Sequence, residues 1–129
     1  MTGLEWDEND FLYCLEVNPI VEDDGLEFHY EVEKNGLVVS VSVIPYRSSV
    51  AFSLSQEGEE VPITSFSLLV SGGVSYEKDK RGEHLVFSQC MFVTDPYDDE
   101  PLQQIENRSN TFDLTVELFI KPHIRIKFN

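Results

Sequence analysis

The stretch that decides the fold is residues 26–44, which read LEFHYEVEKNGLVVSVSVI. Apolar and polar residues alternate up to Lys34, and the alternation resumes after Gly36. A period of two is typical of a strand with one buried face. Asn-Gly is a favoured pair for a two-residue type I′ turn, because both positions of that turn have a positive φ. The stretch therefore predicts a β-hairpin with Asn35 and Gly36 at its tip.

A two-residue turn also fixes the register of the hairpin, because the pairs are counted outward from Lys34 and Leu37. The apolar pairs predicted in this way are Val32 with Val39, Tyr30 with Val41 and Phe28 with Val43. The polar pairs are Glu31 with Ser40 and His29 with Ser42. All the apolar side chains fall on one face, so we expect that face to be buried and the other to meet solvent.

Further alternating runs extend the pattern on the carboxyl side of the hairpin. Half-buried strands are predicted over residues 50–55 and 65–70, a short strand over 74–76, a charged loop over 78–82, and a central strand over 84–93. The long alternation from Phe112 to Phe128 contains Pro122, which cannot donate to a ladder. We expect two strands joined at a bend there, or one strand at a sheet edge.

The predicted fold class is all-β, either an antiparallel β-sandwich or a strongly bent sheet of about eight strands. At most one short helix is expected, near residues 99–107, where Pro101 follows acidic residues at a plausible helix start. The length of 129 residues and the absence of repeats or linkers predict a single β-rich domain over residues 1–129.

Charge is the feature that departs most from the average. The chain carries 24 acidic and 9 basic residues, a formal net charge of −15. Residues 1–33 hold eleven Asp or Glu and no Lys or Arg. Such a surface repels phosphate backbones and anionic lipids, so neither nucleic acid nor a membrane is expected as a partner. A basic protein partner fits the charge best.

The two cysteines, Cys14 and Cys90, lie in apolar runs that read as strands, without a second Cys or a His at metal-ligand spacing. We expect both to be reduced, buried thiols. The amino terminus is acidic and lacks the apolar run of a signal peptide, and no apolar stretch is long enough to cross a membrane. These features predict a cytoplasmic protein with no cofactor.

Three groups of residues are candidates for metal binding or catalysis. His29 with Glu27 or Glu31 could chelate a divalent metal, but the same residues suit the solvated face of a hairpin. Carboxylates that could bind Ca²⁺ cluster at Asp95, Asp98, Asp99 and Glu100, although they lack the spacing of an EF-hand loop and also suit a helix cap. The histidines and serines carry no nucleophile motif. The sequence therefore predicts no catalytic residue and no metal ligand.

Two functions remain open. The first is a non-catalytic protein that binds a basic partner through its acidic surface, and in size, acidity and reduced cysteines the chain resembles bacterial inhibitors and immunity proteins. The candidate partner-binding residues are Asp7, Glu8, Asp10, Asp23 and Asp24. The alternative is a β-sandwich module that binds carbohydrate or Ca²⁺, or a small hydrolase. Its concave sheet would be lined by the exposed aromatic residues Trp6, Tyr46, Tyr97 and Phe119.

Overall fold

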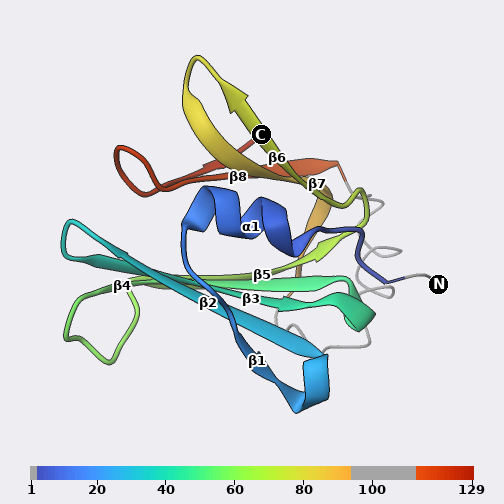
Figure 1. Ribbon diagram of the computed structural model, residues 1–129, viewed down its shortest axis with the longest axis horizontal. Helices are drawn as coiled ribbons and strands as arrows, with labels where there is room; N and C mark the ends of the chain where they lie inside the picture. Colours follow the sequence, from blue (N-terminus) through green and yellow to red (C-terminus); the bar gives the residue numbers. More distant parts are fainter. Residues whose placement is uncertain (1–2, 94–112) are drawn as a thin grey trace.

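The computed structural model describes residues 3–93 and 113–129. In this part of the chain nine strands form one antiparallel sheet, accompanied by one α-helix (Figure 1). The strands are β1 (Ile20–Glu22), β2 (Glu27–Lys34), β3 (Leu37–Ile44), β4 (Ser49–Gln56), β5 (Thr64–Val70), β6 (Val74–Asp79), β7 (Gly82–Val93), β8 (Leu114–Phe119) and β9 (Arg125–Phe128). The helix α1 is Glu8–Leu15, and the 3-10 turns η1 (Asp23–Gly25) and η2 (Pro45–Arg47) join strands.

The all-β expectation is confirmed, in its form of a strongly bent sheet. The strands follow the order β1-β2-β3-β4-β5-β7-β8-β9, and β6 pairs with β7 beside that path. The first half of β7 pairs with β6 and β8, whereas its last residues pair with β5. Gln89, with φ 53°, marks an irregularity between the two halves of β7. Figure 1 shows the result, in which β2–β5 form one layer, β6–β8 form another, and α1 lies between them.

The hairpin register is confirmed pair by pair. Val32 faces Val39, Tyr30 faces Val41, and Lys34 faces Leu37 across the turn. Asn35 has φ 55° and Gly36 has φ 81°, the left-handed values that a type I′ turn requires. The apolar face of the hairpin belongs to the core, where Val39, Val41 and Val43 are fully buried.

Helix α1 was missed by the sequence analysis, which read the run around Cys14 as a strand. The carboxylate of Asp7 accepts a hydrogen bond from the backbone N–H of Asn9, and so caps the helix. Phe11, Cys14 and Leu15 recur at helical spacing and are buried. The Phe11 ring lies 4.9 Å from the Tyr30 ring on β2 and 6.2 Å from the Phe87 ring on β7. The helix therefore packs against both layers. The helix expected near residues 99–107 lies outside the described residues.

Two further expectations concern the second layer. The bend at Pro122 is confirmed, because β8 and β9 are separate antiparallel strands on either side of it. The charged loop over residues 78–82 was wrong, since β6 runs to Asp79 and β7 begins at Gly82. The two strands pair right up to their ends, so that Lys80 and Arg81 alone make the turn. None of the helices in the described residues is long and apolar enough to cross a membrane.

Candidate interaction surface

Three of the five acidic residues that the sequence singled out lie at the start of α1. Asp7 is the N-cap, and Glu8 and Asp10 occupy the first turn. Carboxylates are favourable there because the helix dipole and the free N–H groups make that end positive. These charges therefore have a structural role in the helix as well as any role in binding.

Asp7 and Asp10 also share a hollow of about 290 Å³ with Glu5, opposite the turn between β5 and β6. The backbone N–H of Val74 donates a hydrogen bond to the carbonyl of Glu5 at 2.9 Å, which holds the two segments together. Burial and then the nearby charge of Asp7 raise the pKa of Asp10, and a hydrogen bond from the backbone N–H of Tyr76 opposes them. The hollow is thus acidic, and two of its carboxylates, those of Asp7 and Asp10, already accept hydrogen bonds from the backbone.

The other two residues, Asp23 and Asp24, lie elsewhere. They form η1 between β1 and β2, are exposed, and have left-handed backbone conformations with φ of 50° and 55°. The structure places η1 against β1 and β2, whereas Asp7 and Asp10 line the hollow beside the turn between β5 and β6. The five candidate residues therefore form two groups on different elements.

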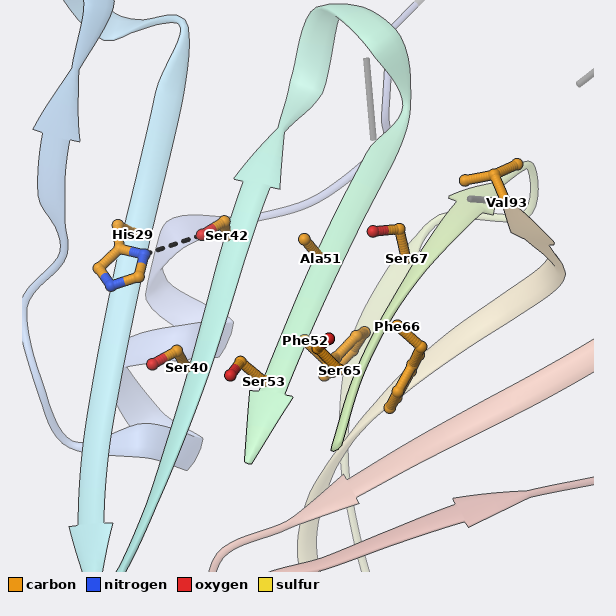
Figure 2. Close-up of a pocket in the computed structure, with 10 residues that line it drawn as sticks. All are labelled: His29, Ser40, Ser42, Ala51, Phe52, Ser53, Ser65, Phe66, Ser67 and Val93. Carbon is orange, nitrogen blue, oxygen red and sulfur yellow. Dashed lines mark hydrogen bonds between the residues drawn. The ribbon is translucent and has the colours of Figure 1, made fainter. Parts of the chain in front are cut away.

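A hollow of about 580 Å³ lies on the outer face of β2–β5, away from α1 (Figure 2). Its floor is made of small side chains that pair from strand to strand. One row across the sheet runs His29, Ser42, Ala51, Ser67 and Val93. The next row runs Glu31, Ser40, Ser53 and Ser65. The hairpin pattern places Ser40 and Ser42 on the polar face, but only the strand order shows that Ser53, Ser65 and Ser67 continue the same surface.

Acidic side chains border this serine floor along β2. Glu27, His29, Glu31 and Glu33 occupy alternate positions of β2, on the same face as the serines. His29 is held by a 2.8 Å contact between its Nδ1 and the hydroxyl of Ser42. Glu31 and Glu33 are exposed, and neither forms an ion pair with another residue in 3–93 or 113–129. No set of three His, Cys, Asp or Glu side chains in these same ranges is placed to hold a metal ion. The loop from Asp95 to Glu100 lies outside them.

A second polar cluster surrounds His84, which is 1% exposed. Its ring stacks on Phe119 at 4.4 Å, and its Nε2 lies 3.2 Å from a carboxylate oxygen of Glu117. Arg125 covers the Phe119 ring at 4.3 Å. Phe119 is therefore buried, and the prediction that it is an exposed aromatic residue is wrong. Trp6 is half-buried against Phe11 and Phe28, Tyr46 is exposed, and Tyr97 lies outside the described residues.

Comparison with known proteins gives a single kind of similarity. No family model matches the sequence, and no curated protein is detectably similar to it. Among solved structures, the chain is similar to one in the "Contact-dependent growth inhibition toxin - immunity protein complex from Klebsiella pneumoniae 342". The match has a TM-score of 0.70 and 21% identity, and it covers 100% of this chain and 98% of the other. At this identity the similarity shows a shared fold.

Proposed function

We propose that this protein binds a basic protein partner and neutralises it, as an immunity protein does with a toxin. The observation that carries the proposal is the similarity in fold, which spans nearly the full length of both chains and involves a structure of a toxin with its immunity protein. The net charge of −15 supports a basic partner, because opposite charge speeds association and disfavours other partners.

The exposed carboxylates of the amino-terminal third are the expected source of the attraction. We propose that Asp7, Glu8, Asp10, Asp23 and Asp24 steer a basic partner towards the protein, although they lie on different elements. Long-range attraction depends on the summed field, so these residues need not form one patch. A cytoplasmic location is part of the proposal, and it is supported by the two free, buried thiols of Cys14 and Cys90.

The test is to isolate the partner and measure what the complex does. Affinity-tagged protein is incubated with lysate of its native host at low salt, and the retained proteins are identified by mass spectrometry. A recovered protein is then produced in pure form, its binding is measured by calorimetry, and its effect on growth is compared with and without this protein. We expect a basic partner that slows growth when alone and is harmless when both are expressed. A partner that is acidic, or whose toxicity is unchanged by this protein, would contradict the proposal.

A further inference from the structure

We infer that the outer face of β2–β5 is the docking surface for a lysine- or arginine-bearing segment of the partner. This inference rests on the proposed function and adds to it the surface and the chemistry of the contact. The surface consists of the serine floor, formed by Ser40, Ser42, Ser53, Ser65 and Ser67, and the acidic border on β2, formed by Glu31 and Glu33.

The floor is suited to close approach by another backbone. Neighbouring strands lie about 4.8 Å apart, so the side chains of β3, β4 and β5 form a dense grid. Most of the side chains of these three strands that line the hollow are serine or alanine, and Phe52 and Phe66 are the large ones. Each hydroxyl can donate one hydrogen bond and accept others, so the floor can pair with both the N–H and the C=O groups of a segment laid across it.

Ser67 provides independent support for a ligand at this face. It lines the hollow and is only 8% exposed. Among residues 3–93 and 113–129 its hydroxyl has no hydrogen-bond partner. The hydroxyl opens onto the hollow and is not among the buried polar atoms that lack a partner, so its hydrogen-bonding capacity is available from the solvent side. A polar group of a docked segment can therefore form a hydrogen bond with Ser67 at the floor of the hollow.

The charge of the border selects a cationic segment. Glu31 lies directly across from Ser40, and Glu33 lies two residues further along β2 on the same face. Both carboxylates are exposed and lack an ion pair within the described ranges, so they are available to a lysine or arginine side chain. The carboxylates near α1 differ, because Asp7 caps the helix and Asp10 accepts a backbone hydrogen bond. For this reason the β2 border, and not the hollow beside α1, is the stronger candidate for direct contact.

The surface can be tested without the natural partner. The probe is a short, capped peptide of alternating lysine and alanine. Its binding is monitored through the backbone amide chemical shifts in NMR spectra of the labelled full-length protein. A peptide of alternating glutamate and alanine serves as the charge control. We expect the lysine peptide to shift amides of β2–β5 around Ser40, Ser53 and Ser65, and the glutamate peptide to shift none of them. Shifts that are confined to α1 and η1 would overturn the inference.

Two pairs of variants separate the surface from general acidity. Glu31→Gln with Glu33→Gln should weaken lysine-peptide binding by about fivefold, as expected for the loss of two exposed charge pairs. Asp23→Asn with Asp24→Asn removes the same amount of charge away from this face and should weaken lysine-peptide binding by less than twofold. Ser53→Trp fills the floor without changing the charge and should abolish binding to the face. Ser75→Trp, in the hollow beside α1, should leave binding unchanged.

The amide spectrum of each variant reports whether it is folded, so that a loss of binding cannot be confused with a loss of structure. If Ser53→Trp binds as the parent does, or if the Asp23 and Asp24 pair has the larger effect, the inference is wrong. The peptide experiment is also independent of the partner's identity. If the peptide binds this face but the partner from the host is not a basic protein, the proposed function fails and the cation-binding surface stands.

Discussion

Arg81 and Glu117 are joined by two parallel hydrogen bonds, although 36 residues separate them in the chain. Nη1 donates to Oε1 at 3.0 Å, and Nη2 donates to Oε2 at 2.8 Å. Arg81 is half-exposed in the turn between β6 and β7, whereas Glu117 is buried on β8. Asn129 also donates a hydrogen bond to Glu117, at 3.0 Å. The pair therefore ties the β6–β7 turn to the neighbouring strand and to the end of the chain.

We expect Arg81→Met to lower the free energy of unfolding at neutral pH and to reduce the loss of stability on acidification. The hydrogen bonds from Arg81 hold the pKa of Glu117 below its ordinary value. A carboxyl group with a lowered pKa in the folded state contributes stability above its unfolded pKa and loses it as the pH falls through the folded value. Without Arg81 this loss should be smaller. The measurement is urea denaturation between neutral pH and about pH 3, a range that spans the ordinary glutamate pKa.

Lys80→Met is the control for that experiment. Lys80 occupies the same turn and is exposed, so its removal changes the charge equally without touching Glu117. The two variants should differ in stability near neutral pH and converge in acid. Equal effects at every pH would mean that the Arg81–Glu117 pair contributes nothing specific.

Gly36→Val should destabilise the protein by about 2 kcal/mol, because a β-branched residue strongly resists a positive φ. Gly36 has φ 81°, and a Cβ added there would meet no atom within 4 Å. The cost is therefore one of backbone conformation and not of crowding. Chemical denaturation gives the difference in free energy of unfolding. Asn35→Gly, which keeps a residue that tolerates the turn, should have a much smaller effect, and an unchanged stability of Gly36→Val would count against the type I′ turn.

Both thiols should be unreactive in the folded protein. Burial raises the pKa of Cys14 to about 12 and that of Cys90 to about 12. Because the thiolate is the reactive form, a thiol-specific chromogenic reagent at mildly alkaline pH should label neither residue until denaturant is added. Rapid labelling of the native protein at either cysteine would show that the core opens readily around it. The Cys14→Ser and Cys90→Ser variants identify which thiol has reacted.

The association rate constant for the proposed partner should fall as the salt concentration rises. Opposite charges accelerate encounter, and the effect fades once the Debye length falls to about 10 Å or below. Changing Asp7, Glu8, Asp10, Asp23 and Asp24 to amides should slow association and alter dissociation much less. Asparagine at position 7 still caps α1, so the fold should survive this change. The measurement is of binding kinetics over a series of salt concentrations. An association rate that does not change with salt would mean that the acidic residues serve only solubility.

The local elements with a strong pattern were the ones that sequence could predict. The Asn35-Gly36 turn fixed every pair of the hairpin because two residues leave no freedom of register. Helix α1 was missed although Asp7, Phe11 and Cys14 carry a cap and helical spacing, because the helix is only 8 residues long and a short apolar run suits a strand equally well.

The candidate surface was harder to predict because it depends on strand order. Sequence identified Ser40 and Ser42 as partners of Glu31 and His29, and interpreted the face as an ordinary solvated one. Ser53 and Ser65 join that face only because β4 and β5 follow β3 in the sheet with no shift of phase. The pattern within one strand does not contain this information.

Strand β7 has a consequence for how the molecule unfolds. Its first half supplies backbone partners to β6 and β8, and its last residues supply them to β5, so one continuous peptide belongs to both layers. Separating the layers requires breaking ladder bonds on either side of Gln89, and Phe11 would lose its contacts with Tyr30 and Phe87 in the same event. We therefore expect the amides of β3 and β8, which belong to different layers, to become exposed to solvent exchange in a single cooperative opening.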